Sequence, residues 1–222
     1  MNVFQFVNKD VQTKDMCKIA LIQSGYNIKH IRNDLIDYNM CKIAVEKSPK
    51  SLEFIPWKHH TYDICMVSVK NDGTCLKFVR PDLQTEEMCL ISLKWNGSNI
   101  KYVRKELQTE EMCKMIIRDY NFESIKYVRS DLITYNLCKM AVYKIGHNIK
   151  YIDRKYLNEE ICMIAIKNDG LNLKYIDPEI QTYEICMESV KHFGNNLQFV
   201  RPDLQTEEMC YIALNIEKFV YI

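Results

Sequence analysis

Cysteine recurs along this chain at a nearly fixed interval, and this spacing constrains the fold more than any other feature. The recurring residues are Cys17, Cys41, Cys65, Cys89, Cys113, Cys138, Cys162, Cys186 and Cys210. Every interval is 24 residues except for one of 25, between Cys113 and Cys138. A fixed period of this length indicates one small supersecondary unit, stacked about nine times. We therefore interpret residues 1–222 as a single repeat array without an internal domain boundary.

A residue type that often caps a helix stands four positions before each cysteine. The nine residues are Thr13, Asp37, Thr61, Thr85, Thr109, Thr134, Asn158, Thr182 and Thr206. Their side-chain oxygens accept a hydrogen bond from a backbone N–H that otherwise has no partner. An acidic residue or an asparagine follows two positions later, and negative charge there suits the positive end of the helix dipole. The pattern predicts an α-helix that starts at each capping residue.

The end of this helix is marked eight residues after the cysteine. All six glycines fall at that position: Gly25, Gly73, Gly97, Gly146, Gly170 and Gly194. We expect them to adopt the left-handed conformation that closes a helix of about ten to twelve residues. A small residue three positions after the cysteine, such as Ala165, predicts the close approach of a neighbouring backbone. Ile116 breaks this column, so we expect a local change of stacking at its repeat.

The segment before each helix is open to two interpretations. Its apolar positions fit two helical turns, with an asparagine such as Asn99 as the cap, whereas Pro81 and Pro178 lie where proline kinks or begins a helix. The favoured fold class is all-α, an α-solenoid of about nine 24-residue helix–turn–helix repeats. The alternative is a short strand over residues 76–79, which gives an α/β solenoid like the leucine-rich repeats.

An aromatic residue recurs eleven positions before most of the cysteines. The column comprises Phe6, Phe54, Phe78, Tyr102, Tyr127, Tyr151, Tyr175 and Phe199. Such a column can be interpreted as a platform on which bases stack. Its strict period beside aliphatic positions favours a place in the core instead.

Ten cysteines do not indicate disulfides in this chain. Equivalent residues of stacked repeats lie about 8–10 Å apart, whereas a disulfide needs Cα atoms within about 7 Å. The repeated cysteines are therefore expected to pack as small apolar side chains. Neither paired Cys-x-x-Cys nor Cys/His spacing occurs, so no metal is predicted. Cys75 lies outside the column and is the best candidate for a reactive thiol.

The composition and the absence of known motifs argue against a membrane protein, a secreted protein and an enzyme. The chain carries a net charge of +1, shows no apolar leader at Met1, and contains no run of about 18 apolar residues. We expect no membrane segment and no secretory signal. No Ser-His-Asp set, phosphate loop or metal motif is visible, so the sequence predicts no catalytic residue and no cofactor.

The repeat itself resembles a known type. The segment FVRPDLQTEEMC occurs at Phe78–Cys89 and again at Phe199–Cys210, and looser copies such as YVRKELQTEEMC lie between them. This unit resembles short repeats in proteins of giant DNA viruses that infect amoebae, the mimivirus group. It also looks like a helical repeat domain of unknown function found in those viruses and in some intracellular bacteria. The resemblance implies an intracellular protein that acts in the host cytoplasm or the viral factory.

Aromatic residues outside the repeat pattern are the candidate partner-binding residues, since large exposed aromatics often anchor interfaces. They are Trp57, Trp95, Tyr120, Phe122 and Phe193. A histidine pair, His59 and His60, also departs from the pattern, and we interpret it as a tolerated irregularity rather than a metal or catalytic site.

A second candidate surface is a basic rib suited to phosphate. It comprises Lys77, Arg80, Lys101, Arg104, Lys126 and Arg129. Acidic residues two positions after the arginines favour a solvated, charge-balanced face, and a nucleic-acid binder is usually more basic. The favoured function is a non-enzymatic scaffold that binds a protein partner, and the alternative is a nucleic-acid-binding solenoid. The apolar chain ends comprise Val3, Phe4 and Phe6 at the start and residues 219–222 at the finish. We expect the C-terminal residues to dock as a lid, like a shortened first element of a further repeat, or the two ends to pair with another copy in a homodimer.

Overall fold

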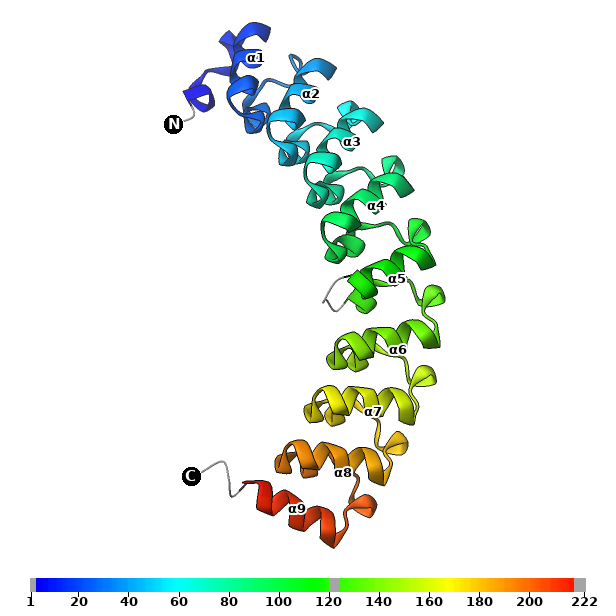
Figure 1. Cartoon of the computed structure of the whole chain (residues 1–222). Coiled ribbons are helices and arrows are strands. Elements are labelled where there is room, and N and C mark those ends of the chain that lie inside the picture. The colour runs from blue at the N-terminus through cyan, green and yellow to red at the C-terminus, as the bar shows by residue number, and fades with distance from the viewer. Residues whose placement is uncertain (1–2, 120–123, 218–222) are drawn as a thin grey trace. The chain divides into compact units, whose positions relative to one another are not determined.

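The computed structural model describes residues 3–119 and 124–217 (Figure 1). In these ranges the regular structure is entirely helical, without a strand. The fold is an all-α solenoid, as favoured, and the α/β interpretation is wrong. The chain divides into two compact units, Met1–Gln108 and Thr109–Ile222, and each is described by itself. The expectation of one uninterrupted array over residues 1–222 stays a prediction.

The described part of each repeat contributes one α-helix. The first unit contains α1 (Lys14–Gln23), α2 (Tyr38–Lys47), α3 (Tyr62–Asn71) and α4 (Glu86–Trp95). The second contains α5 (Glu110–Asp119), α6 (Tyr135–Lys144), α7 (Glu159–Asn168), α8 (Tyr183–His192) and α9 (Glu207–Glu217). Within a unit, each α-helix packs on the next one along the chain (Figure 1). None of the described helices combines the length and the apolar character that crossing a bilayer requires.

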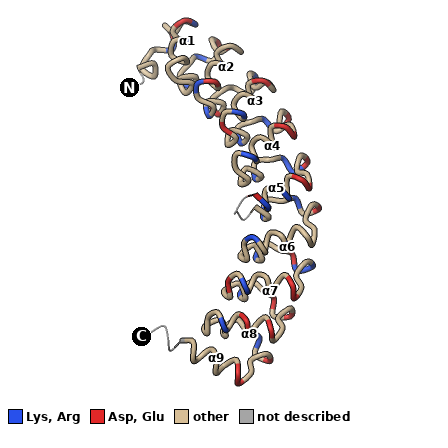
Figure 2. The backbone as a smooth tube through the Cα atoms, viewed as in Figure 1, with Lys and Arg blue, Asp and Glu red and all other residues tan. Residues whose placement is uncertain are grey.

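Each α-helix begins at its predicted capping residue. The Thr85 hydroxyl accepts from the Met88 N–H at 3.3 Å, and the Asp37 carboxylate accepts from the Met40 N–H at 3.0 Å. The same bond starts all nine α-helices in the described ranges. Acidic side chains gather in the first turns, where the helix dipole favours them (Figure 2). The start of each helix is thus set by local sequence.

The first element of each repeat is helical, but it is a 3-10 helix rather than an α-helix. These longer 3-10 helices are η1 (Val3–Phe6), η3 (Gly25–His30), η4 (Pro49–Phe54), η6 (Gly73–Phe78), η8 (Gly97–Tyr102), η10 (Ser124–Tyr127), η12 (Gly146–Tyr151), η14 (Gly170–Tyr175) and η16 (Gly194–Phe199). Asp72, Asn96 and Asp169 cap η6, η8 and η14. The asparagine expected as the cap lies inside the element instead.

A three-residue 3-10 turn usually follows. These turns are η2 (Lys9–Val11), η5 (Trp57–His59), η7 (Pro81–Leu83), η9 (Lys105–Leu107), η11 (Ser130–Leu132), η13 (Arg154–Tyr156), η15 (Pro178–Ile180) and η17 (Pro202–Leu204). Proline begins η7, η15 and η17. At the first position of a helix its fixed φ suits the helical backbone, and its missing N–H would have no partner within the helix. The interpretation of Asp177-Pro178 as a helix start is confirmed.

The glycines do not close the α-helices in the way expected. No described glycine has a positive φ, and α1–α4 and α6–α8 each end at an extended residue just before the glycine position. Glycine is needed instead because the next repeat lies too close for a side chain. A Cβ on Gly73 would lie 2.6 Å from the Trp95 Cβ, and one on Gly146 would lie 2.6 Å from the Asn168 Cβ.

The small column forms the other side of this contact, which we call the seam. Ser92 donates its hydroxyl proton to the Gly73 carbonyl at 2.6 Å, and Ser189 donates to the Gly170 carbonyl at 2.8 Å. The inner asparagine completes the seam, since Asn99 Nδ2 donates to the Ser92 carbonyl at 3.1 Å. The predicted close approach of neighbouring backbones at this column is confirmed.

Candidate functional site

The aromatic column does not lie in the core. A 3-10 helix has three residues per turn, so Gly73, Leu76 and the following Val79 share one buried side. Phe78 falls beside that stripe and is half-buried, as is Tyr102 one repeat later. Phe54 and Phe6 are exposed. The core assignment of this column is therefore wrong, and the column presents aromatic rings at the surface.

A lysine precedes most of these aromatic residues and lies against the ring. Lys77 Nζ is 4.5 Å from the Phe78 ring centroid, and Lys101 Nζ is 4.9 Å from that of Tyr102. Both distances are within the range of a cation–π contact. The same contact recurs in the second unit, at 4.7 to 5.2 Å. We call these pairs the Lys–aromatic ladder: Lys77–Phe78, Lys101–Tyr102, Lys126–Tyr127, Lys150–Tyr151 and Lys174–Tyr175.

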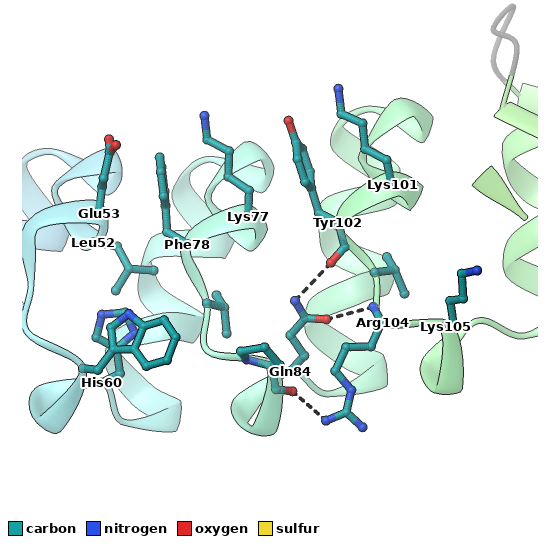
Figure 3. A pocket seen from close by; sticks show the side chains of 14 residues that line it. Leu52, Glu53, His60, Lys77, Phe78, Gln84, Lys101, Tyr102, Arg104 and Lys105 are labelled. Atoms are coloured by element: carbon teal, nitrogen blue, oxygen red, sulfur yellow. Dashed lines mark hydrogen bonds between the residues drawn. The ribbon is translucent and has the colours of Figure 1, made fainter. Parts of the chain in front are cut away.

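In the first unit the ladder borders an open groove of about 610 Å³ (Figure 3). Lys77 and Phe78 from η6 and Tyr102 from η8 project to the same side of the groove. Trp57, the first residue of η5, also lines it and is 64% exposed. Three successive repeats thus contribute large aromatic side chains to this groove.

The groove is basic. Lys77, Lys101, Lys105 and Arg104 line it, and Glu53 is the one carboxylate among its lining residues in the described first unit. Acidic residues gather instead at the starts of the α-helices. This arrangement suits a partner that carries negative charge.

The arginines of the predicted phosphate rib have protein partners. The Arg80 guanidinium contacts the Asp82 carboxylate at 2.6 Å and donates to the Trp57 carbonyl at 3.2 Å. The hydrogen bond that Arg80 donates to the Asp82 carboxylate lowers the pKa of Asp82. Arg104 donates in the same way to the Pro81 carbonyl, at 2.8 Å. Arg129 pairs with Asp131 in the second unit at 2.6 Å.

The structure therefore groups the rib lysines with aromatic rings rather than with arginines. Lys101 and Arg104 extend in opposite directions from their backbone (Figure 3). Lys126 lies over the Tyr127 ring and is 5.4 Å from the Tyr151 ring. Phosphate binding by the rib stays a prediction.

The two predicted anchor aromatics of the first unit, Trp57 and Trp95, do not share the groove. Trp57 lies in the groove, whereas Trp95 ends α4, does not line the groove, and is 55% exposed beside Gly73. Phe193 is exposed after α8, in the second unit. Tyr120, Phe122 and the apolar end Phe219, Val220, Tyr221 and Ile222 lie outside the described residues.

The histidines that depart from the repeat pattern, His59 and His60, are held in the fold by burial and, for His60, by contacts with neighbouring residues. His60 is buried, with Nε2 3.1 Å from the Ile55 carbonyl and Nδ1 3.9 Å from Cys65 Sγ. Burial lowers the pKa of His60 and of His59, which favours neutral rings. The described residues hold no group of three or more His, Cys, Asp or Glu side chains placed to bind a metal ion.

The cysteines pack as small apolar side chains, as predicted. All ten are free thiols, and all except Cys210 are buried. Burial raises the pKa of Cys41 and Cys65 to about 12 and that of Cys89 to about 11. Cys75 is buried as well, and burial raises its pKa to about 11. The interpretation of Cys75 as a reactive thiol is therefore wrong, because a protonated, covered sulfur is a poor nucleophile.

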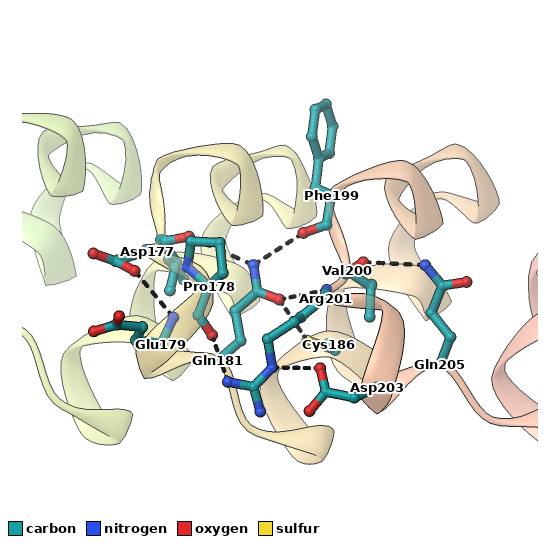
Figure 4. Close-up of polar contacts among 11 residues, drawn as sticks. Asp177, Pro178, Glu179, Gln181, Cys186, Phe199, Val200, Arg201, Asp203 and Gln205 are labelled. Carbon is teal, nitrogen blue, oxygen red and sulfur yellow. Dashed lines mark hydrogen bonds and ion pairs between the residues drawn. The ribbon is translucent and has the colours of Figure 1, made fainter.

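A glutamine that the sequence reasoning missed holds successive repeats in register. Gln181 Nε2 donates to the Phe199 carbonyl at 2.9 Å, and its Oε1 accepts from the Arg201 N–H at 2.9 Å (Figure 4). Gln84 bonds the Tyr102 carbonyl and the Arg104 N–H, each at 3.1 Å. Each glutamine donates to a backbone carbonyl in the next repeat, and the residue that carries this carbonyl belongs to the aromatic column. The signal was a glutamine recurring five positions before the cysteine.

These features define the class of protein: an all-α solenoid with buried seams and, in its first unit, a basic groove lined by aromatic residues. Residues 61–108 and 135–181 each match a family described as a domain of unknown function (DUF4116). Each matched stretch starts where an α-helix starts and spans two repeats. The chain is thus similar to this family over less than half of its length. No curated protein and no solved structure matches it.

Proposed function

We propose that this chain is a non-enzymatic scaffold that recruits a protein partner through the Lys–aromatic ladder. The supporting observation is the groove of the first unit, which Trp57, Phe78 and Tyr102 line together with Lys77 and Lys101. Rigid aromatic side chains give large contact area at low entropic cost and often dominate interface energy. Solenoids commonly bind through such surfaces, because equivalent positions of successive repeats align.

The charge of the groove narrows the kind of partner. We infer that the partner inserts an extended segment that carries acidic residues, which pair with Lys77, Lys101 and Lys105. The apolar side chains of the same segment cover the rings of Phe78 and Tyr102. As part of this proposal, the chain is a viral protein that acts inside the host cell, as the repeat resemblance implies.

Affinity capture from nuclease-treated cell extract tests it. The purified chain should retain a discrete protein, and both Trp57→Ala and Tyr102→Ala should reduce the amount retained by about tenfold or more. Tyr143→Ala is the matched control, since this aromatic residue is exposed and lies on α6 in the other unit. Equal capture by the wild-type chain and both groove variants would show that the ladder is not the binding surface.

A second candidate function is binding of single-stranded nucleic acid. One observation favours it: rings and lysines alternate along the ladder, and stacking platforms flanked by cations bind single strands without sequence preference. We favour the hypothesis of a protein partner, because the arginines have carboxylate and carbonyl partners within the chain and the net charge is only +1.

Fluorescence anisotropy with a labelled single-stranded oligonucleotide separates the two candidates. Binding that falls steeply with salt and is weakened by Lys77→Glu and Lys101→Glu would make nucleic acid the leading candidate. The scaffold proposal predicts no such binding, together with capture that survives nuclease treatment.

A further inference from the structure

The contact between successive repeats has two apolar sides. One is the column one residue before each cysteine, which we call the front column; its internal members are Met40, Ile64, Met88, Met112, Leu137, Ile161, Ile185 and Met209. The other is the column four residues after each cysteine, which we call the back column; its members up to α8 are Leu21, Val45, Val69, Leu93, Ile117, Val142, Ile166 and Val190. All sixteen side chains are buried.

The first repeat leaves its front column uncovered. Met16, the front residue of α1, is 46% exposed, although every later member of this column is at most 2% exposed. Ile19 and Ile22 on the same helix are exposed as well. Ile22 occupies a position that later repeats give mainly to charged residues, for example Lys70, Lys94 and Lys167. The exposed face of α1 is therefore more apolar than the repeat pattern requires.

The last repeat leaves its back column uncovered. Leu214 on α9 is 67% exposed, whereas every earlier member of the column is at most 3% exposed. Tyr211, one turn earlier, is exposed too. Front residues are uncovered only in the first repeat and back residues only in the last. Within each unit, the front column therefore faces the preceding repeat and the back column faces the following one.

Among the described residues, a polar group at the same end bonds its own repeat alone. Gln181 bonds the Phe199 carbonyl and the Arg201 N–H of the following repeat. Gln205, its equivalent, bonds the Val200 carbonyl of its own repeat at 3.0 Å (Figure 4). Within the described ranges it reaches no later repeat. Its amide is thus positioned to bond the backbone of a repeat that packs on α9.

We propose that two copies of this chain associate head to tail, with the α9 face of one copy packed on the α1 face of the next. The occupant is a second copy because the two faces are the two halves of the internal repeat contact. Leu214 would meet Met16 as each back residue meets the next front residue. Packing α1 on α1, or α9 on α9, would place like columns together and match no contact within the chain. A contact between different faces is heterologous, so it leaves one face of each kind open at the ends of a pair.

This inference uses α1 and α9 and does not rest on the proposed function of the ladder. Its test is the mass of the 222-residue chain in solution, measured by sedimentation at increasing concentration. The wild-type mass should rise above that of a monomer. Met16→Glu and Leu214→Glu should each weaken association by about tenfold or more, because a carboxylate would be buried without a partner. Both side chains are exposed in a single copy, so neither change should lower the melting temperature.

Mixing the two variants gives the decisive result. Met16→Glu retains a normal α9 face and Leu214→Glu retains a normal α1 face, so the mixture should form dimers and nothing larger. The control Tyr143→Glu changes an exposed apolar residue away from both ends and should associate like the wild-type chain. A wild-type chain that stays monomeric would overturn the proposal. So would a single end variant that associates like the wild-type chain, a mixture that stays monomeric, or loss of association in the control.

Discussion

Two columns of this repeat share one period and have opposite surroundings. The small column, represented by Ala165 and Ser92, lies in the seam between repeats and is fully buried. The aromatic column, represented by Phe78 and Tyr102, stands beside lysines and lines a groove. The difference teaches that a strict period shows repetition and does not by itself show burial. Burial depends on the number of residues per turn of the element that carries the column.

The largest expected effect concerns the buried cysteine column at high pH. Burial raises the pKa of Cys41 and Cys65 to about 12 and that of Cys113, Cys162 and Cys186 to about 11. An unfolded thiol has a pKa of about 8.5, so the folded chain keeps protons that the unfolded chain loses. The stabilisation is complete below about pH 8.5 and declines as the pH rises toward the folded values. At about pH 10 each thiol should cost roughly 1–2 kcal/mol of stability.

Thermal melting across this pH range checks the effect, since several thiols act together. Cys162→Ala removes one of these thiols, so the free energy of unfolding should fall less steeply with pH, by the contribution of one proton. A melting temperature that stays level between about pH 8.5 and pH 10.5 would contradict the burial of the column.

The next largest effect is overpacking of the seam. Ala165→Trp should lower the free energy of unfolding by roughly 3 kcal/mol or more, because the fully buried Cβ leaves no room for an indole between repeats. Lys167→Trp on the same helix is the control and should be almost neutral, since Lys167 is exposed. Denaturant unfolding measures both, and equal stability of the two variants would refute a close seam at Ala165.

A direct comparison within η8 gives an intermediate effect. Ile100→Ala should cost about 3 kcal/mol, because Ile100 is fully buried and its loss leaves a cavity. Tyr102→Ala, two residues on, should cost less than about 1 kcal/mol, because the ring is half-buried and the carbonyl that Gln84 bonds is retained. Denaturant unfolding again gives both values. A larger loss for Tyr102→Ala than for Ile100→Ala would restore the core assignment of the aromatic column.

The smallest expected effect separates two equivalent glutamines. Gln181→Ala should cost roughly 1–2 kcal/mol, because it removes two hydrogen bonds to the next repeat and leaves buried groups without partners. Gln205→Ala should cost less, because the Gln205 bonds stay within its own repeat. The difference between the two midpoints of unfolding is the measurement. If the order is reversed, the glutamine does not act by joining repeats.

Local signals in the sequence were enough for the α-helices. A threonine such as Thr85 and the acidic residue after it act within one turn, so the starts of the helices could be predicted from adjacent residues. The small column could be predicted as well, because a helix with a regular small residue accepts a close neighbour. These features depend on neighbours in sequence or on strict repetition.

The first element could not be assigned in the same way. Six residues such as Gly73–Phe78 cannot separate a period of 3.6 from a period of 3.0, and that difference moves Phe78 from the core to the surface. The role of Gly73 depends on Trp95, in the next repeat, and the role of Gln84 depends on backbone 18 to 20 residues away. The groove needs side chains from three repeats. Contacts of this kind depend on how the repeats stack, and the sequence does not specify this stacking directly.

Hydroxyl-radical footprinting with mass spectrometry tests the central claim most directly, because it measures the exposure of both kinds of column in one experiment. At a concentration where the chain is a single copy, the account predicts rapid oxidation of Tyr102 and Tyr175 in the ladder, and of Met16 on the exposed face of α1. It predicts strong protection of Met40 and Met88, which are fully buried in the front column. Protection of the ladder tyrosines, or oxidation of Met40 and Met88 at the rate of Met16, would contradict it.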